Sequence, residues 1–168
     1  EYLLKQSDTH TLIMIDGYRD SNYNEIIGEL CPELENTVPG EPLHSKRLPF
    51  LRNVITVGFK KKGCLTWEEA IKRAPSVPKE EVYRIAATVD VNDVCNMQYT
   101  SGTTGFPKGV MLTHRNIVNN GKIIGDRMDI STADKMMIQV PMFHCFGMVL
   151  SMTNLMTHGG TLCPMPYF

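Results

Sequence analysis

Apolar runs alternate along the chain with segments whose apolar residues recur at helical spacing. Short continuous apolar runs are typical of strands that are covered on both faces of a parallel sheet. The predicted strands are residues 11–15, 53–59, 94–100, 110–112, 136–140 and 161–165. Because strands and helices take turns, the pattern predicts an α/β fold, with a layered and mostly parallel sheet flanked by helices.

Helical spacing and capping residues place the helices. Thr66 is followed three residues later by Glu69, which is the pattern of a capping box. Residues 35–52 hold three prolines and one glycine and are predicted to be irregular. The predicted helices are residues 22–34, a short helix capped by Thr66, a weaker helix over 79–87, a long helix over 113–128 and a helix over 148–156.

The long helix is predicted to be amphipathic, with Thr113 as its cap. Its expected inner face consists of Ile117, Gly121, Ile124 and Met128, and its outer face of Asn119, Lys122 and Asp126.

The composition is that of an ordinary soluble domain, with 42% hydrophobic and 21% charged residues and a net charge of −1. Since the charges are spread along the chain, they indicate no basic face for nucleic acid, and we expect the lysine run at residues 60–62 to be a solvated loop. Five cysteines without C-x-x-C spacing indicate reduced thiols, so we expect a cytoplasmic protein. The most apolar stretch, residues 143–156, is too short and too polar to span a membrane.

The segment YTSGTTGFPKGVMLTH, from Tyr99 to His114, has an unusual composition. Its ten positions 100–109 include four hydroxyl residues, three glycines, one proline and one lysine. Phosphate oxygens need many donors at short range. Glycines let main-chain N–H groups come close, and hydroxyls and an ammonium group add further donors. We therefore predict a phosphate-binding loop rather than a plain surface turn.

The spacing of this loop differs from the Walker pattern, because Lys108 is followed by Gly109 and not by a hydroxyl residue. Residues 110–112 are predicted to form a short strand, so no helix begins directly after the loop. The dipole of the next helix should then lie away from the phosphates, and the hydroxyls and Lys108 should contribute more of the binding. The motif argues against a P-loop NTPase.

Two motifs resemble the adenylate-forming superfamily, which comprises acyl-CoA synthetases, aryl-CoA ligases, luciferases and peptide-synthetase adenylation domains. YTSGTTGFPKG is similar to the phosphate-loop signature of that superfamily. PMFHCFGM, at residues 141–148, is similar to its next motif, which lies beside the carboxylate substrate. The residues around both motifs resemble fatty-acyl-CoA synthetases of the medium- or long-chain kind, closely after Asp93 and more loosely before it.

The resemblance implies an enzyme that joins a carboxylic acid to ATP, releases pyrophosphate and passes the acyl group to coenzyme A. Its implied substrates are a fatty acid, ATP and coenzyme A, with Mg²⁺ nearest Thr103. Lys108 would be catalytic, by stabilising the charge that develops on pyrophosphate. The implied ATP-binding residues are Thr100, Ser101, Gly102, Thr103, Thr104, Gly105, Phe106, Pro107 and Lys108.

By the same resemblance, His144 would be a second catalytic residue beside the carboxylate, and Phe146 and Gly147 would join it in binding the substrate. The residues alone leave another interpretation open, in which His144 is partly buried and bonded to the main chain. Three methionines recur every four residues and fit either a core stripe or the wall of an acyl tunnel. They are Met148, Met152 and Met156.

Several parts of the family pattern are absent from the chain, namely a glutamate motif for magnesium, an aspartate motif for the ribose, a hinge and a C-terminal catalytic lysine. We therefore expect residues 1–168 to be a single partial AMP-binding domain without the C-terminal domain, and to be inactive alone. The sequence does not fix the oligomeric state. Two alternatives stay open: a non-catalytic nucleotide- or polyphosphate-binding module, and another carboxylate activator such as an aryl-CoA ligase.

Overall fold

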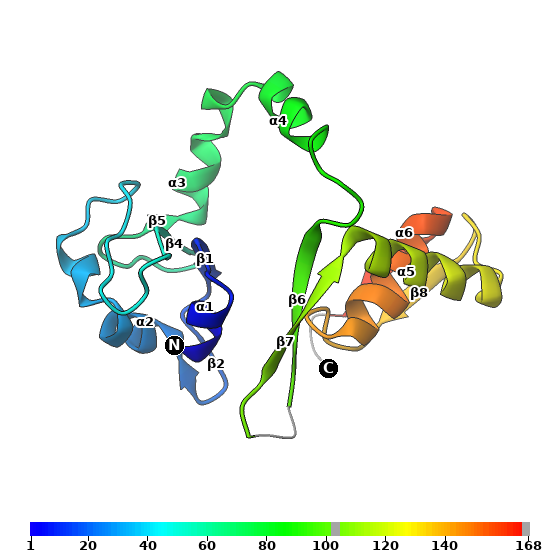
Figure 1. Ribbon diagram of the computed structural model, residues 1–168, viewed down its shortest axis with the longest axis horizontal. Coiled ribbons are helices and arrows are strands. Elements are labelled where there is room, and N and C mark those ends of the chain that lie inside the picture. The colour runs from blue at the N-terminus through cyan, green and yellow to red at the C-terminus, as the bar shows by residue number, and fades with distance from the viewer. Residues whose placement is uncertain (102–104, 166–168) are drawn as a thin grey trace. The chain divides into compact units, whose positions relative to one another are not determined.

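The computed structural model describes residues 1–101 and 105–165, and the chain divides into two compact units (Figure 1). The first unit is Glu1–Ala87 and the second is Thr88–Phe168. Each unit contains a parallel pairing of strands together with helices, which confirms the predicted α/β class.

The first unit is built on a parallel sheet with the strand order β1-β4-β5. Leu12 pairs with Val54, and Ile55 pairs with Leu65. The elements of this unit are α1 (Tyr2–Gln6), β1 (Thr11–Met14), β2 (Gly17–Tyr18), β3 (Ser21–Asn22), α2 (Tyr23–Leu30), η1 (Pro32–Asn36), β4 (Asn53–Thr56), β5 (Leu65–Thr66), α3 (Trp67–Lys72), η2 (Ala74–Ser76) and α4 (Lys79–Ala86).

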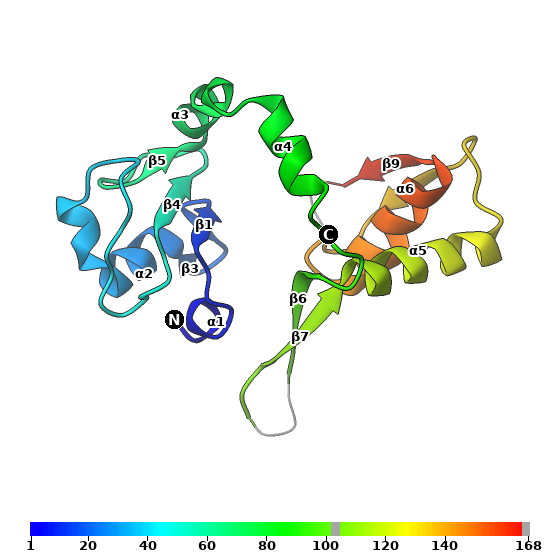
Figure 2. The ribbon, with the colours of Figure 1, turned by 45° about the horizontal axis from the view of Figure 1, so that its top comes forward.

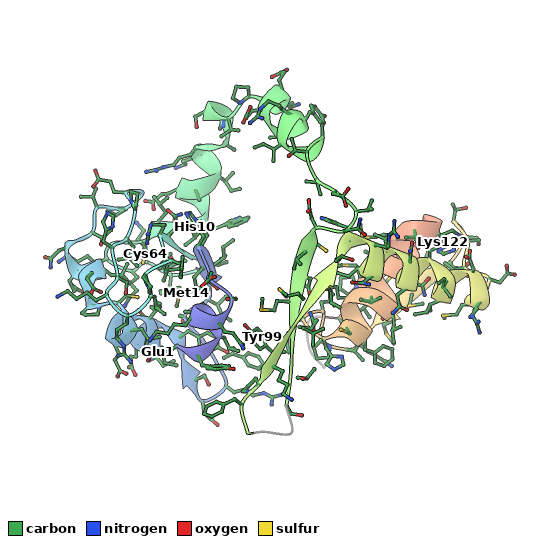
Figure 3. The ribbon with its side chains drawn as sticks, in the orientation of Figure 1. Glu1, His10, Met14, Cys64, Tyr99 and Lys122 are labelled. Carbon is green, nitrogen blue, oxygen red and sulfur yellow. The ribbon has the colours of Figure 1, made fainter. Side chains whose placement is uncertain are left out.

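Side chains from the sheet, from α2 and from the irregular segment form the core of the first unit. That segment lacks regular structure after η1, as predicted, yet it contributes three of the buried leucines. Met14 and Cys64, which Figure 3 labels, belong to the same core. Its buried members are Met14, Ile27, Leu30, Cys31, Leu34, Leu43, Leu48, Leu51, Val54 and Cys64.

The helix predicted over residues 22–34 is correct at its start and ends earlier than expected. Asn22 caps α2 by accepting a hydrogen bond from the Glu25 amide at 3.1 Å. The α-helix ends at Leu30 and the chain continues as the 3₁₀-helix η1. Pro32 explains this end, because proline lacks an N–H group and disfavours helical geometry at the residue before it.

Two further expectations for the first unit need correction. The strand predicted over residues 53–59 ends at Thr56, and Gly58 follows in a turn with φ of 80°. The lysine run is only partly a solvated loop. The Lys61 ammonium donates to the main-chain oxygen of Asn24 at 3.0 Å and to its side-chain oxygen at 2.8 Å. Lys61 therefore joins the loop to the N-terminal turn of α2.

The second unit combines an antiparallel hairpin, a parallel strand pair and a helical layer. The hairpin strands β6 and β7 are antiparallel, whereas β8 and β9 are parallel. Its elements are β6 (Val94–Thr100), β7 (Lys108–Thr113), α5 (His114–Met128), β8 (Lys135–Ile138), the π-helix η3 (Phe146–Thr153), α6 (Asn154–His158) and β9 (Thr161–Pro164).

Helix α5 packs against η3 and α6 through two buried glycines (Figure 2). A Cβ atom at Gly121 would lie 2.7 Å from a methyl carbon of Thr153, and one at Gly125 would overlap the His158 ring. Thr113 caps the helix as predicted, since its hydroxyl accepts from the Asn116 amide at 3.2 Å. Met128 is 53% exposed, but its sulfur accepts a hydrogen bond from the side-chain amide of the buried Asn154 at 3.6 Å, so it lies at the edge of the predicted inner face.

The methionine stripe is not a core stripe in this unit. Met148 and Met152 are half-buried and Met156 is 66% exposed. The buried side of η3 and α6 instead carries Val149, Ser151, Thr153, Asn154 and Leu155.

Candidate functional site

The predicted phosphate loop is the tip of the β6–β7 hairpin. Six residue pairs join the two strands of the hairpin, and the pair nearest the tip is Thr100 with Lys108. Residues 101–107 connect the strands, and residues 102–104 lie outside the described part of the chain. The predicted strand over 110–112 is confirmed and is longer, since β7 begins at Lys108. Lys108 is therefore a strand residue and not a loop residue.

The register places Thr100 and Lys108 on the same face of the hairpin, because directly paired residues of antiparallel strands share a face. Gly109 pairs with Tyr99 on the opposite face. A Cβ at Gly109 would lie 2.9 Å from the Met97 sulfur and 3.3 Å from the Tyr99 ring. Glycine at this position thus leaves room for Met97 and for Tyr99, and Figure 3 labels Tyr99.

The described residues of the loop suit an anionic ligand. Thr100, Ser101 and Lys108 are exposed, so two hydroxyls and one ammonium are accessible. Gly105 has φ of 88°, a conformation that favours glycine, and among the residues that the structure describes nothing lies within 4 Å of the position of its missing Cβ. The open space beside Gly105 lets a ligand reach the main chain. Phe106 is 66% exposed and Pro107 is half-buried.

No helix begins at this loop. Helix α5 starts at His114, at the opposite end of β7 from the loop, as the sequence predicted. Its N-terminal amides are capped by Thr113 and are separated from the loop by the whole length of the strand. The dipole of α5 therefore acts away from the loop, because a helix dipole acts mainly within the first turn.

The second motif, residues 141–148, comprises the segment before η3 and the first residues of η3. His144 is exposed, and its Nδ1 accepts a hydrogen bond from the Phe146 amide at 3.1 Å. Its main-chain oxygen also accepts from the Met148 amide at 3.0 Å. His144 is thus bonded to the main chain, as one interpretation held, although it is not buried. Since Nδ1 accepts, the ring hydrogen of the neutral imidazole lies on Nε2.

Phe146 and Gly147 have different surroundings. Phe146 is 52% exposed, whereas Gly147 is buried. A Cβ at Gly147 would overlap the main-chain oxygen of Pro141 and would lie 2.9 Å from the Cα of Met142. Gly147 therefore allows the start of η3 to pack on the preceding segment. Its contribution to the site is close packing of the main chain.

The structure brings Thr100 and Lys108 together, and it brings His144, Phe146 and Gly147 together. Both groups belong to the second unit, on separate elements. Thr103, predicted to lie nearest Mg²⁺, is outside the described residues, as are Gly102 and Thr104. Within residues 1–101 and 105–165, no group of three or more His, Cys, Asp or Glu side chains is arranged to hold a metal ion.

Sequence reasoning missed two residues of η3 that follow the second motif. Ser151 and Thr153 are buried, and their hydroxyls donate to main-chain oxygens of Phe146 at 3.2 Å and Met148 at 2.9 Å. The available signal was the placement of two hydroxyl residues inside an otherwise apolar helix. A buried hydroxyl needs a hydrogen-bond partner, and inside a helix the nearest acceptor is a carbonyl of the preceding turn.

The pKa shifts in the second unit arise mainly at the contact between α5 and α6. The hydrogen bond to the Asn154 carbonyl, followed by that to Asp126, raises the pKa of His158. The Lys122 ammonium, followed by His158, lowers the pKa of Asp126. His158 Nε2 lies 3.1 Å from Asp126 Oδ1, and Lys122 Nζ lies 2.8 Å from the same oxygen. These groups stabilise the packing of the two helices.

Solved structures share this fold. The apo structure of Mycobacterium smegmatis MbtA matches 96% of this chain and 26% of that chain, with a TM-score of 0.71 and 21% identity. A fatty acyl CoA synthetase of Mycobacterium tuberculosis matches 99% of this chain and 27% of that chain, with a TM-score of 0.66 and 19% identity. At these identities the likeness defines the fold class.

Sequence comparison then gives the family. The family model described as "AMP-binding enzyme" matches residues 1–168, and this chain belongs to that family. YngI of Bacillus subtilis (strain 168), provisionally named an acyl-CoA synthetase, is 44% identical over 169 residues, which cover 100% of this chain and 31% of YngI. The human mitochondrial medium-chain acyl-CoA ligase ACSF2 is 34% identical over 167 residues, covering 96% of this chain and 27% of that protein.

The relatives are much longer than this chain. It spans less than a third of the length of the curated relatives that it matches. Among the helices described here, none is both long enough and apolar enough to cross a membrane.

Proposed function

We propose that this chain is the part of an ATP-dependent carboxylate-activating ligase that holds the triphosphate and borders the acid. Acyl-CoA ligases recur among its relatives, and the function of an acyl-CoA ligase is the one that the site supports best. One observation supports the proposal above the others: a seven-residue loop rich in hydroxyls and glycine is closed by the pair Thr100 and Lys108. Both side chains lie on one face, accessible to a polyphosphate.

The proposed reaction has two halves. In the first half, a carboxylate oxygen attacks the α-phosphorus of ATP, and the bond to pyrophosphate breaks to give an acyl-adenylate. In the second half, the sulfur of coenzyme A attacks the acyl carbonyl and AMP leaves. Lys108 and the loop donors would stabilise the charge on departing pyrophosphate, and Mg²⁺ bound to the phosphates would neutralise part of the same charge.

The proposed role of His144 follows from its hydrogen bonds. Its Nδ1 is engaged by the Phe146 amide, so its Nε2–H group is the donor that remains for a ligand. A carboxylate is an acceptor, and Nε2–H of His144 suits it. Phe146 is exposed on the same segment and would contact the apolar part of the acid.

A fatty acid is the proposed substrate class, with coenzyme A as the acyl acceptor. The names of the human and bacterial relatives support an aliphatic acid. An anthranilate CoA ligase, AuaEII, has the same fold with a TM-score of 0.70, at 21% identity. An aromatic acid is therefore the alternative that the substrate assay must include.

The test is ATP–pyrophosphate exchange, measured with a panel of fatty and aromatic acids. We expect exchange by the longer protein that carries this sequence and none by residues 1–168 alone, which we propose to be a single partial domain. Exchange by residues 1–168 would contradict the proposed inactivity of the part. A longer protein that binds ATP but exchanges with no acid would favour a non-catalytic nucleotide-binding module.

A further inference from the structure

The helix η3 is wound more loosely than an α-helix, and two buried hydroxyls follow its wide turn. Ser151 Oγ donates to the Phe146 oxygen and Thr153 Oγ1 donates to the Met148 oxygen, in each case five residues back. The Asn154 amide also donates to the Val149 oxygen, five residues back. In an α-helix the corresponding main-chain bonds reach four residues back. Wide turns of this kind are rare and are often found at functional sites.

Both hydroxyls donate to main-chain oxygens of residues whose amides donate to His144. The Phe146 oxygen accepts from Ser151, while the Phe146 amide donates to Nδ1 of His144. The Met148 oxygen accepts from Thr153, while the Met148 amide donates to the main-chain oxygen of His144. Through the main chain of Phe146, one of these series leads from the buried side of η3 to the exposed imidazole, and through that of Met148 the other leads to the main-chain oxygen of His144.

The far end of η3 is fixed in place by α5. The Thr153 methyl packs where a Cβ of Gly121 would stand, and the near end of η3 packs on Pro141 through Gly147. With both ends held, the winding between them decides where the peptide groups of Phe146 and Met148 lie. These peptide groups in turn set the position and the tautomer of His144.

We propose that Ser151 and Thr153 are positioning residues for carboxylate binding, which act through the main chain of Phe146 and Met148 to hold His144 with Nε2–H toward the acid. The inference rests on the proposed function, since it concerns the acid side of that site. Neither hydroxyl contacts the substrate itself, because both are buried and bonded to the main chain.

The chain supplies a matched control in Thr157. Its hydroxyl also donates to main-chain oxygens of its own helix, to Thr153 at 3.0 Å and to Asn154 at 2.8 Å. These acceptors lie four and three residues back, in the ordinary α pattern of α6. Removing the Thr157 hydroxyl therefore removes hydrogen bonds to the main chain at the junction of η3 and α6, but none of the bonds that reach five residues back.

The experiment uses the longer protein that carries this sequence and measures KM for a fatty acid and KM for ATP in acyl-adenylate formation. Ser151→Ala and Thr153→Val remove a hydroxyl and keep nearly the same shape. We expect each to raise the KM for the acid roughly three- to tenfold, the size of one lost hydrogen bond, and to leave the KM for ATP unchanged. Thr153→Ser should restore the KM, and Thr157→Val should not change it.

Amide hydrogen exchange is a second measurement on the same variants. We expect faster exchange over residues 146–154 in Ser151→Ala than in Thr157→Val. The inference is overturned if the acid KM is unchanged in both Ser151→Ala and Thr153→Val, if Thr157→Val raises it equally, or if Thr153→Ser is as poor as Thr153→Val. An unsubstituted protein that adenylates no acid would overturn the proposed function, and this inference with it.

Discussion

The Phe146 amide donates a hydrogen bond to Nδ1 of His144, at a distance of 3.1 Å. This bond directs the Nε2–H group of the ring away from its own main chain. We predict that His144→Ala in the longer protein raises the KM for the acid about tenfold or more, as expected for a lost hydrogen bond to a charged group. The control is His44→Ala, at an exposed histidine of the first unit, which should leave the KM unchanged.

Lys108 is the cation at the base of the phosphate loop, opposite Thr100. We predict that Lys108→Ala in the longer protein lowers the rate of acyl-adenylate formation by roughly 100- to 1,000-fold, the usual cost of removing one donor to a developing negative charge. Initial rates of ATP–pyrophosphate exchange at saturating acid measure this.

The matched variant for Lys108 is Lys135→Ala, at an exposed lysine that begins β8 in the same unit. It changes the net charge by the same amount and leaves the hairpin intact. Equal rates in the two variants would contradict a specific role for Lys108, because a general loss of positive charge would affect both.

Gly125 allows α5 to approach α6, since a Cβ there would overlap the His158 ring. We predict that Gly125→Ala lowers the free energy of unfolding of the second unit. Overpacking costs about 1–3 kcal/mol, which is as large as or larger than the gain of about 1 kcal/mol in helix propensity. The loss should appear as faster amide exchange along α5 and a lower urea midpoint.

The control for Gly125 is Gly28→Ala in α2. The nearest neighbour of a Cβ there is the flexible end of Lys61, at 3.2 Å. We expect a smaller loss than at Gly125, because the Lys61 ammonium has to shift by only a few tenths of an ångström while the gain in helix propensity is the same. Stabilisation by Gly125→Ala would show that the contact between α5 and α6 is looser than described.

The contact between Asp126 and His158 predicts a dependence of stability on pH. The raised pKa of His158 means that its contribution is complete below the ordinary imidazole pKa, about 6.5, and is lost as the pH rises through the raised value. The lowered pKa of Asp126 means that its contribution is complete above the ordinary value, about 3.9, and is lost as the pH falls through the lowered value. The pair therefore stabilises the unit most between these two pH values.

Urea midpoints of the unsubstituted chain and of Asp126→Asn test the pH prediction. We expect the difference between them to be largest near pH about 5–6 and to shrink toward pH about 8–9, as His158 loses its proton. Some difference should remain there, because Lys122 still pairs with Asp126. A difference that grows as the pH rises would contradict the ion pair.

The sequence predicted those features that depend on nearby residues. The Thr66 and Thr113 caps were predicted correctly, because a cap depends on a hydroxyl and on an amide three residues later. The strand after the phosphate loop was also predicted, since VML is apolar and lacks helical spacing. The roles of the loop residues and of His144 remain predictions.

The features that sequence reasoning missed depend on distant partners. The bond from Lys61 to Asn24 spans 37 positions, and nothing local indicates it. The wide turn of η3 depends on packing at both of its ends, against Pro141 and against Gly121. The spacing of the methionines fitted either a core stripe or a tunnel wall, and spacing alone did not show that Met148 and Met152 are only half-buried and Met156 is exposed.

The cysteines are distributed unevenly between the two units. Cys31 and Cys64 are buried in the first unit, and burial raises the pKa of the Cys64 thiol to about 11. Cys95 and Cys163 are exposed in the second unit. A thiol-reactive reagent should therefore label the second unit at once and the first unit only as it unfolds. The labelling rate at Cys64 would thus time the opening of the first unit without any engineered probe.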